Sequence, residues 1–373
     1  MSYPPARIGD PLSAIDTPSL IIDLDAFEFN LRRLPESLIG KPVRIRPHAK
    51  THKSPIIALK QIELGAVGVC CQKVSEAEVL VRGGVRDVLV SNEIIGARKL
   101  ERLAALAKLA TIGVCVDDAQ SVRDIAAAVA RLNAKLDVYV EIDVGTFRCG
   151  VLPGAPAVAI AKEISAHKRL RFAGLHAYHG AAQHQRSYAA RSASIHAACE
   201  HAIATRQALQ GAGLDCPITT GAGTGTYLFE AASNTYNEIQ PGSYIFMDVD
   251  YGRNHGEDGA PISQFRQSLF VWATVMSRPT SERAVVDAGL KALSVDSGMP
   301  LVADLRGVEY ARVSDEHGVL LIKDAETKIA LGDKIRLTPG HCDPTVNMHD
   351  WYVGVRNGMV EQLWPISARG AMF

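Results

Sequence analysis

The sequence predicts an α/β protein, a (β/α)8 TIM barrel with a second, C-terminal all-β domain. Between about residues 43 and 247, short β-branched runs alternate with Ala-rich amphipathic segments, the pattern of parallel strands joined by helical crossovers. After about residue 255 the helical pattern nearly vanishes, and short apolar runs are separated by Gly, Asp and Pro, which indicates strands and turns. The 373 residues suffice for a barrel of roughly 250 residues and one further unit.

The barrel prediction depends on eight strand candidates with helix patterns between them. The helix patterns are clearest at 54–64, 118–133 and 188–211, where apolar residues recur at helical spacing. A doubly wound parallel sheet is the alternative, because it is built from the same strand–helix units. The expected strands are 43–47, 66–71, 87–91, 111–116, 137–143, 172–177, 217–220 and 242–247.

The all-β domain is expected at residues 255–373 together with residues 1–24, and the barrel at residues 25–254. Residues 1–24 join the β domain because the segment 17–24 has the pattern of an early strand. No low-complexity linker separates the two units, so we expect a close interface between them. The expected strands of this domain are 270–278, 283–289, 301–313, 318–322, 333–339 and 351–365.

Composition excludes several classes of partner. Lys and Arg together number 40, as do Asp and Glu, and neither sign gathers in a stripe or tail, which argues against nucleic acid and membrane surfaces as partners. No apolar run approaches the roughly 20 residues of a membrane span. The seven cysteines are odd in number, two are adjacent, and no CxxC pair or apolar signal core occurs. We therefore expect a reduced, cytoplasmic protein.

Two small-residue turns predict a phosphate site. TIM barrels bind phosphate groups after strands seven and eight, and here the seventh strand candidate is followed by the glycine-rich run 221–226. Its backbone N–H groups could cradle an anion, and the turn at 240–244 lies beside it in the predicted fold. The run lacks the GxxxxGK[ST] pattern of a nucleotide loop. A flexible surface loop is the alternative interpretation.

A lysine-rich segment, RPHAKTHKS at 46–54, follows the first strand candidate. A lysine at this strand end would point into the barrel mouth, where desolvation would lower its pKa and free the amine for imine formation. Lys50 is the candidate, and the alternative is that Lys50 and Lys53 are solvated loop lysines. His52 could orient a cofactor or only pack.

These motifs together resemble the D-threonine aldolase and D-serine dehydratase family, which belongs to the alanine-racemase-like fold-type III enzymes that use pyridoxal 5'-phosphate (PLP). The resemblance runs over nearly the whole chain in the family's order. The alanine racemases themselves match less well, because their lysine lies in a different local motif. The matching segments are RPHAKTHK, GVCCQKVSEAE (68–78), GAGTGTY (221–227), DAGLKALSVDSG (287–298), SDEHG (314–318) and GHCDPT (340–345).

The resemblance implies a role for each matching residue. Lys50 would carry PLP as a Schiff base, Arg148 would lie near the cofactor's phenolic oxygen, and Tyr178 would approach the pyridine nitrogen. Arg148 and Tyr178 also follow the fifth and sixth strand candidates, on the active face of a barrel. The residues expected to hold the phosphate are Gly223, Thr224, Gly225, Gly242, Ser243 and Tyr244.

A His-Cys-Asp triplet predicts a metal site. On an extended segment, residues two apart share a face, so His341 and Asp343 could bind one ion while Cys342 points away. The resemblance implies a divalent-metal site beside the cofactor. One imidazole and one carboxylate suit Mn²⁺, Mg²⁺ or Co²⁺ better than a structural zinc. D-serine dehydratases of the family tend to use His-x-Cys with zinc, so the Asp favours the aldolase branch.

The expected reaction is retro-aldol cleavage of a D-3-hydroxy amino acid to glycine and an aldehyde, with His184 as the general base near the substrate hydroxyl, as the resemblance implies. A dehydratase giving a 2-oxo acid and ammonia uses the same residues and is the first alternative, and a non-catalytic PLP carrier is the second. A homodimer is expected from the resemblance alone. Asp315, Glu316 and His317 match the family without an assigned role.

Overall fold

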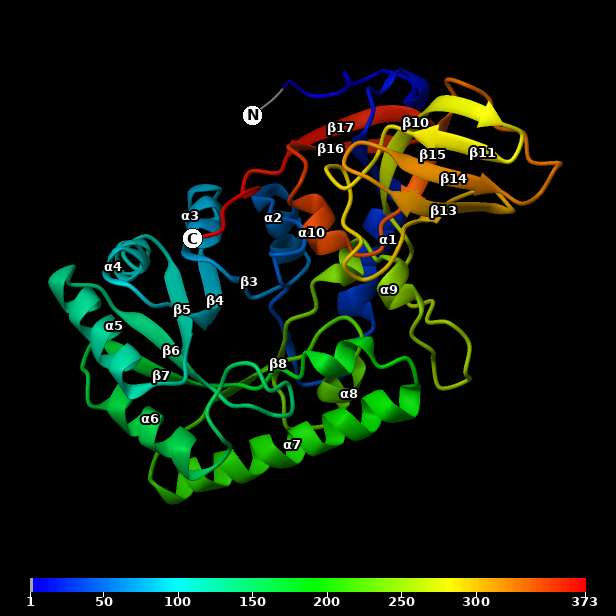
Figure 1. Cartoon of the computed structure of the whole chain (residues 1–373). Coiled ribbons are helices and arrows are strands. Elements are labelled where there is room, and N and C mark those ends of the chain that lie inside the picture. Colours follow the sequence, from blue (N-terminus) through cyan, green and yellow to red (C-terminus); the bar gives the residue numbers. More distant parts are fainter. Residues whose placement is uncertain (1–2) are drawn as a thin grey trace.

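The computed structural model describes residues 3–373, and Figure 1 shows two sheets with helices around one of them. The first sheet has eight strands, all paired in parallel, in the order β2-β9-β8-β7-β6-β5-β4-β3. The strands are β2 (Arg44–Ile45), β3 (Val69–Cys71), β4 (Asp87–Glu93), β5 (Thr111–Val116), β6 (Leu136–Glu141), β7 (Leu170–His176), β8 (Ile218–Gly221) and β9 (Glu238–Ile239).

Backbone hydrogen bonds join the two ends of this sheet. Val67 N donates to Ile45 O, and Cys70 N donates to Pro47 O, both at 2.9 Å, so β3 lies beside β2 and the sheet curls round on itself. The predicted TIM-type barrel is therefore confirmed against a doubly wound sheet, whose edge strands stay apart. Helices on the outside of the barrel are α2 (Pro55–Glu63), α3 (Val74–Arg82), α4 (Ala97–Leu106), α5 (Ala119–Arg131), α6 (Ala155–Ser165), α7 (Tyr188–Gly211) and α8 (Tyr227–Ala232).

The barrel helices form because each has an apolar stripe and a suitable N-terminus. In α5 the Asp118 side chain caps the helix by accepting from the backbone N–H groups of residues 120 and 121, as N-cap residues do. Val122, Ile125 and Val129 of the same helix are buried, at the spacing that places them on one face. They pack against strands such as β5, whose residues after the first are all buried, as parallel strands between two layers require.

The second sheet has nine strands and is mostly antiparallel. Its early strand, β1 (Ser19–Asp23), pairs antiparallel with β10 and parallel with β16, as the pattern at 17–24 predicts. Helix α1 (Leu24–Glu36) follows it and leads into the barrel. The remaining strands are β10 (Leu269–Thr280), β11 (Arg283–Val286), β12 (Leu301–Val302), β13 (Val308–Val313), β14 (Gly318–Ile322), β15 (Lys334–Thr338), β16 (Trp351–Arg356) and β17 (Met359–Pro365).

One prediction about the barrel is wrong in its detail. The eighth barrel strand is β9 rather than 242–247, and Ser243–Ile245 form the 3₁₀-helix η3. Gln240 N still donates to Gly221 O, but Pro241 follows and has no N–H with which to continue the ladder. The segment looked like a strand because Ser243–Met247 are all buried, and a short buried run has no readable period.

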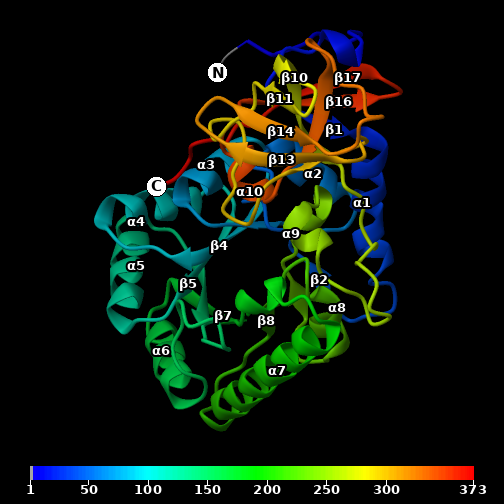
Figure 2. The same ribbon diagram turned by 45° about the vertical axis from the view of Figure 1, so that its right-hand side comes forward.

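Helix α10 (Cys342–Val346) lies between the nine-stranded sheet and the barrel (Figures 1 and 2). The extended conformation predicted for His341–Asp343 is therefore wrong: His341 is the N-cap, and Cys342 and Asp343 begin the helix. Pro344 fits this first turn, where a backbone N–H has no helical partner.

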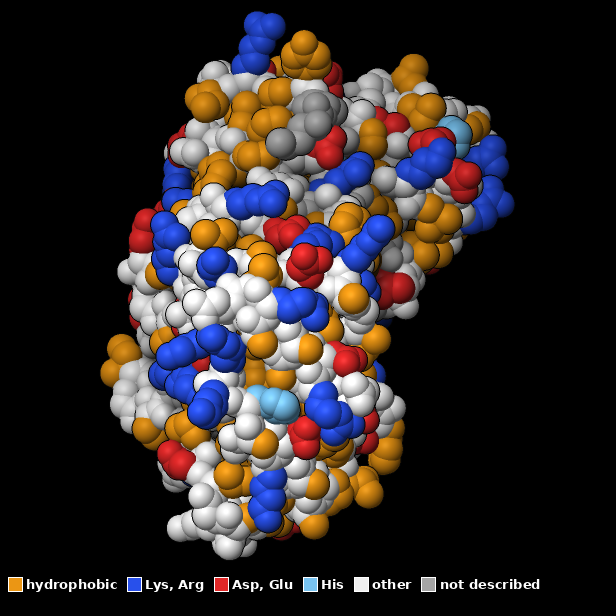
Figure 3. Space-filling model, turned by 90° about the vertical axis from the view of Figure 1, so that its left-hand side faces the viewer, with side chains coloured by type: hydrophobic (Ala, Val, Ile, Leu, Met, Phe, Trp, Pro, Cys, Tyr) orange, Lys and Arg blue, Asp and Glu red, His pale blue; other side chains and the backbone are white. Residues whose placement is uncertain are grey.

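Acidic and basic side chains are interspersed on the face in Figure 3. No helix within residues 3–373 is long and apolar enough to span a membrane.

Candidate active site

Lys50 lies in the loop between β2 and α2, at the carboxyl end of the barrel. Its Nζ is 3.1 Å from Oδ2 of Asp343, so a barrel residue meets the His-Cys-Asp segment across the interface of the two sheets. The Asp343 carboxylate raises the pKa of Lys50 despite the opposing effect of burial. The prediction that desolvation lowers the pKa of Lys50 is therefore wrong, because the nearby carboxylate stabilises the ammonium form.

A cavity of about 200 Å³ opens in front of Lys50. Glycine is required on its wall: a Cβ on Gly223 would lie 2.5 Å from Gln183 Oε1, and one on Gly242 would lie 2.6 Å from Thr51 Oγ1. The lining residues are His48, Lys50, Thr51, Gln72, Ser91, Arg148, His176, Tyr178, Ala222, Gly223, Thr224, Gln240, Gly242, Ser243 and Tyr251. Within residues 3–373, no acceptor takes the backbone N–H groups of Gly223, Thr224, Gly242 and Ser243, so the turns can receive an anion.

Two of the predicted phosphate residues lie behind the cavity wall. Gly225 N donates to Gln183 Oε1 at 3.0 Å, and Tyr244 N donates to Thr224 Oγ1 at 2.9 Å. The Tyr244 side chain is buried, and its hydroxyl accepts from Gln61. Both residues therefore support the turns from behind, and their N–H groups are already engaged.

Arg148 and Tyr178 line the same cavity as the glycine turns. The Arg148 guanidinium is 5.7 Å from the centre of the Tyr178 ring, a cation–π distance. Asp143 shapes the loop before Arg148, because its Oδ1 accepts from the backbone N–H groups of residues 145, 146 and 147. Thr146 then donates to Tyr178 O. Both residues follow barrel strands, β6 and β7, and line one cavity, in agreement with the prediction that they lie at the same end of the barrel.

A buried polar cluster lies at the carboxyl ends of β5, β6 and β7, where His176 also lines the cavity, and sequence reasoning missed it. His176 Nδ1 lies 3.1 Å from Glu141 Oε2, and the ligand atoms of Cys115, Glu141 and His176 all lie within 4.8 Å of one another. Burial alone would lower the pKa of His176, but Glu141 raises it. Burial and then Glu141 raise the pKa of Glu93 to about 7. The available signal was a polar residue at the end of each of four consecutive strands.

His184 lies at the rim of the mouth, in the 3₁₀-helix Ala181–His184, and does not line the cavity. Its Nδ1 is 2.5 Å from Oδ2 of Asp250, and Arg186 donates to the other carboxylate oxygen. Burial would raise the pKa of Asp250, but the hydrogen bonds from His184 and Arg186 lower it to about 2. The sequence offered no sign that Asp250 would reach His184.

His341 and Asp343 flank Cys342 at the start of α10. His341 Nδ1 is 2.8 Å from Asp296 Oδ2, a partner that the sequence did not reveal. Burial would raise the pKa of Asp343, but the charges of Lys50 and His341 hold it well below its usual range. An imidazole oriented by a carboxylate, next to a second carboxylate, is a donor set that binds divalent metals.

The remaining sequence candidates pack rather than line the cavity. His52 is fully buried, and its Nδ1 accepts from Ser54 N. Lys53 is ion-paired with buried Glu76 at 2.6 Å. Residues 314–317 form a turn against Gly289, whose added Cβ would lie 2.3 Å from Ser314 O.

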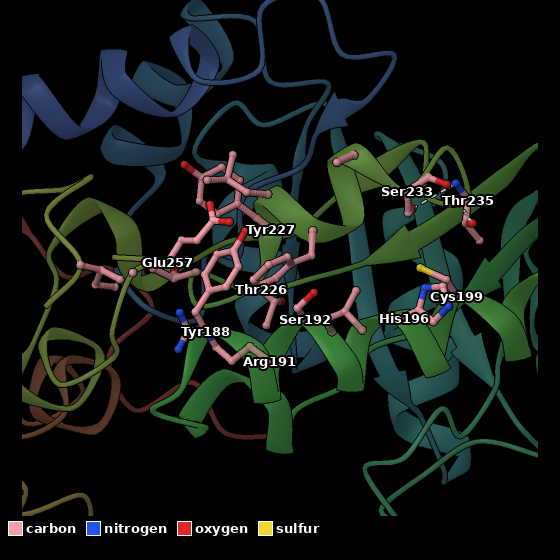
Figure 4. Close-up of a pocket in the computed structure, with 18 of the residues that line it drawn as sticks. Tyr188, Arg191, Ser192, His196, Cys199, Thr226, Tyr227, Ser233, Thr235 and Glu257 are labelled. Atoms are coloured by element: carbon pink, nitrogen blue, oxygen red, sulfur yellow. Dashed lines mark hydrogen bonds between the residues drawn. The ribbon is translucent and has the colours of Figure 1, made fainter. Parts of the chain in front are cut away.

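A larger cavity of about 560 Å³ lies on the outer side of the glycine-rich turn, between α7, α8 and the loop at Glu257 (Figure 4). Thr224 lines both cavities. Arg191 of α7 is buried beside this cavity, and its guanidinium donates to the backbone carbonyls of residues 185, 186 and 255. The lysine and the residues with unengaged N–H groups line the smaller cavity, and Asp343 lies beside it through its contact with Lys50.

Comparison with known proteins gives concordant matches. Residues 22–250 match the model of the alanine racemase N-terminal domain, and residues 268–355 match a serine dehydratase domain model. A 3-hydroxy-D-aspartate aldolase of Paracoccus denitrificans (strain Pd 1222) is 50% identical over 98% of this chain and 95% of its own. A D-threonine aldolase of Arthrobacter sp. is 46% identical over 98% of this chain and 96% of its own.

A solved structure agrees with these sequence matches. The crystal structure of D-threonine aldolase from Filomicrobium marinum superposes with a TM-score of 0.96 and 51% identity, covering 99% of this chain and 100% of that one. The similarity extends over both sheets, so it includes the barrel mouth and the segment that carries His341 and Asp343. The chain therefore belongs to the family of D-threonine aldolases and 3-hydroxy-D-aspartate aldolases, whose barrel is of the alanine racemase type.

Proposed function

We propose that this lyase cleaves D-3-hydroxy amino acids of the D-threonine type to glycine and an aldehyde, with PLP and a divalent metal ion. One observation carries the proposal. Lys50, from the barrel, and Asp343, from the other sheet, lie 3.1 Å apart beside a cavity walled by two glycine turns. A cofactor amine and a metal ligand at one barrel mouth are what a metal-assisted PLP lyase needs.

The residues of the smaller cavity fit PLP. Lys50 supplies the amine for a covalent bond, and the free N–H groups of the turns at 223–224 and 242–243 supply donors for a phosphate group. Gly223 and Gly242 leave the space that a side chain would fill. Arg148 and Tyr178 remain our candidates for contacts with the ring substituents, and Gly225 and Tyr244 would hold the cradle in shape.

The residues beside Lys50 fit a divalent metal. We assign its ligands to His341 and Asp343, with Mn²⁺, Mg²⁺ or Co²⁺ as the expected ions, because one imidazole and one carboxylate leave room for water and substrate oxygens. Asp296 fixes the His341 ring through Nδ1, which leaves Nε2 as the ligand atom. The metal supplies Lewis-acid polarisation of the substrate's β-hydroxyl.

In the proposed reaction His184 accepts the proton of the β-hydroxyl at Nε2. The Cα–Cβ bond then breaks, the β-carbon and its oxygen become the aldehyde carbonyl, and a proton returned to Cα completes glycine. PLP, when bound, supplies an electron sink for the pair left on Cα. Before substrate binds, Lys50 would hold the cofactor through its amine, and the turns at 223–224 and 242–243 would hold its phosphate group.

A dehydratase remains the second candidate, because residues 268–355 match a serine dehydratase domain model. In that reaction Lys50 would take the α-proton and the hydroxyl would leave, giving a 2-oxo acid and ammonia. Product analysis separates the two: the purified protein, loaded with PLP and Mn²⁺, is incubated with D-threonine or 3-hydroxy-D-aspartate. We expect glycine and an aldehyde, and ammonia without glycine would refute the aldolase. A non-catalytic PLP carrier would give neither product.

We further propose a homodimer in the cytoplasm, with two structural units at residues 25–254 and at 255–373 with 1–24. Residues 20, 22, 269 and 271 of the nine-stranded sheet share one apolar cluster with residues 239 and 244–246 of the barrel. Such a shared cluster supports a fixed relation between the two units, which the Lys50–Asp343 contact requires. Sedimentation of the PLP-loaded protein would test the assembly.

A further inference from the structure

Asp250 connects the two halves of the proposed catalytic machinery. It belongs to the short helix α9 (Val249–Gly252), and its side chain is almost fully buried, at 6% exposure. One carboxylate oxygen faces His184 Nδ1 at 2.5 Å, and the other accepts from Arg186. The Asp250 backbone N donates to Gly340 O at 3.2 Å, directly before His341.

The neighbouring residues of α9 fix the same relationship. Asp248 caps the helix by accepting from Tyr251 N, and its second oxygen accepts from Cys342 N at 3.0 Å. Val249 N donates to Pro339 O. Tyr251 lines the cofactor cavity, and its ring lies 5.9 Å from the His184 ring. The segment 248–251 therefore holds His184 on one side and the start of α10 on the other.

The carboxylate determines which nitrogen of His184 can act. An ionised carboxylate only accepts hydrogen bonds, so the nitrogen facing Asp250 must carry a proton. That nitrogen is Nδ1, and in the neutral ring Nε2 is then unprotonated. The His184 side chain is about half exposed, at 49%, and its ring lies 5.9 Å from that of Tyr251, which lines the cofactor cavity.

We propose that Asp250 is the positioning residue that locks His184 in the Nδ1-protonated tautomer, with Nε2 free to accept the substrate's hydroxyl proton. The inference rests on the proposed function for the identity of that proton, and on geometry for the tautomer. A histidine and a buried carboxylate at hydrogen-bond distance form the same orienting pair that other general bases use. The bond from Asp250 N to Gly340 O keeps this base in register with His341 and Asp343.

The Asp250→Asn variant tests the inference. Arg186 has only donors, so the Asn oxygen would face Arg186 and its NH₂ group would face His184. That NH₂ group requires an acceptor at Nδ1, which moves the ring proton to Nε2. In ¹⁵N-histidine-labelled holoenzyme, the His184 signals, assigned with His184→Gln, should show protonated Nδ1 in the wild type and protonated Nε2 in Asp250→Asn. An Nε2-protonated wild type would overturn the inference.

Kinetics provide the second readout. With PLP absorbance and Mn²⁺ binding retained, kcat of Asp250→Asn should fall at least about 100-fold, the lower range for a general base. Asp250→Asn added to His184→Gln should cause no further loss, because the two residues act as a unit. A kcat within threefold of wild type, or an additive loss in the double variant, would refute the positioning role. Arg186→Gln is the matched control. It leaves the Asp250 carboxylate facing His184, so His184 should keep the proton on Nδ1.

The two failures are distinguishable. The tautomer is measured without substrate, so an Nδ1-protonated His184 that changes in Asp250→Asn supports the inference whatever the substrate is. If the wild-type holoenzyme releases no glycine from D-threonine or 3-hydroxy-D-aspartate, the proposed function fails instead. If the Asp250→Asn protein does not fold, Asp250→Glu is used instead: it keeps the carboxylate, so His184 should stay protonated on Nδ1, and an Nε2-protonated His184 in this variant would contradict the inference.

Discussion

Lys50 Nζ and Asp343 Oδ2 lie 3.1 Å apart, although one follows the first barrel strand and the other lies in the first turn of α10, between β15 and β16 of the nine-stranded sheet. This pair places the proposed cofactor amine and a proposed metal ligand within one site. The Asp343 carboxylate also raises the pKa of Lys50, because a nearby negative charge favours the ammonium.

The glycine turn makes a prediction about cofactor affinity. Gly223→Ala should weaken PLP binding at least about tenfold, since the new Cβ would meet Gln183 Oε1 at 2.5 Å and displace the turn. Titration of the PLP-free protein by absorbance measures this. Gly211→Ala is the matched control: that glycine has nothing within 4 Å of its added Cβ, so PLP affinity should be unchanged. Equal affinity in the two variants would contradict the cradle.

The contact between Asp296 and His341 makes a prediction about metal affinity. Asp296→Asn should lower Mn²⁺ affinity by roughly 10–100-fold, as loss of a residue that orients a ligand does, because His341 Nδ1 loses its carboxylate partner. Calorimetric titration of the PLP-loaded protein would measure it. Asp304→Asn, which removes an exposed carboxylate paired with Arg336, should leave the affinity unaltered. Unchanged affinity in both would place the metal elsewhere.

Metal removal should separate catalysis from cofactor binding. Chelation with EDTA, or the variant His341→Ala, should abolish cleavage and leave the visible PLP band, because His341 is not among the residues that line the cofactor cavity. The band and the released glycine are followed in the same sample. His196→Ala, at an exposed histidine of α7, serves as the control. Full turnover in EDTA would show that the ion is dispensable.

Glu230 predicts a pH effect on stability. This residue of α8 is buried behind the glycine-rich turn and accepts from Thr226, and burial raises its pKa to about 7. The folded state then holds a proton that the unfolded state loses near its ordinary value of 4.5, so stability falls as pH rises from 4.5 to 7. Glu230→Gln should remove this loss and gain roughly 3 kcal/mol above pH 7.

Urea unfolding of wild type and Glu230→Gln between pH 4 and pH 8 measures that effect. The two proteins should have similar stability at the acidic end, where Glu230 is protonated in both states, and diverge toward neutral pH. Parallel curves across the whole range would mean that Glu230 is ionised in the folded protein or that it is not buried.

The sequence predicted those parts of the fold that depend on local periodicity. Strands such as β5 and helices such as α5 followed from buried runs and apolar stripes. The predicted position of the eighth barrel strand was wrong. Pro241 ends the hydrogen-bond ladder, and the uniformly buried segment after it has no visible period. The extended conformation predicted for His341–Asp343 was also wrong, because helix α10 begins there. An HxD pattern alone does not distinguish an extended segment from the start of a helix.

The site divided along the same line. Lys50, Arg148, Tyr178 and the glycine turns line one cavity, as expected of a barrel that directs its strand ends to one mouth, although Arg148 and Tyr178 were singled out by the family resemblance. Asp250 and Asp296 could not, because each reaches its histidine from a distant segment through a loop or short helix. Glu141 and His176 form their pair on adjacent strands; the polar residue at the end of each strand was the available signal, and the resemblance had directed attention to other residues.

The most direct test of the central claim is borohydride reduction of the PLP-loaded protein followed by mass spectrometry of its peptides. In the wild type we expect a reduced pyridoxyl group on Lys50. The Lys50→Ala protein should show no covalent label and no visible band, and Lys108→Ala, at an exposed lysine, should behave as wild type. A Lys50→Ala protein that keeps a borohydride-reducible band, or a label found on another lysine of the wild type, would contradict the claim.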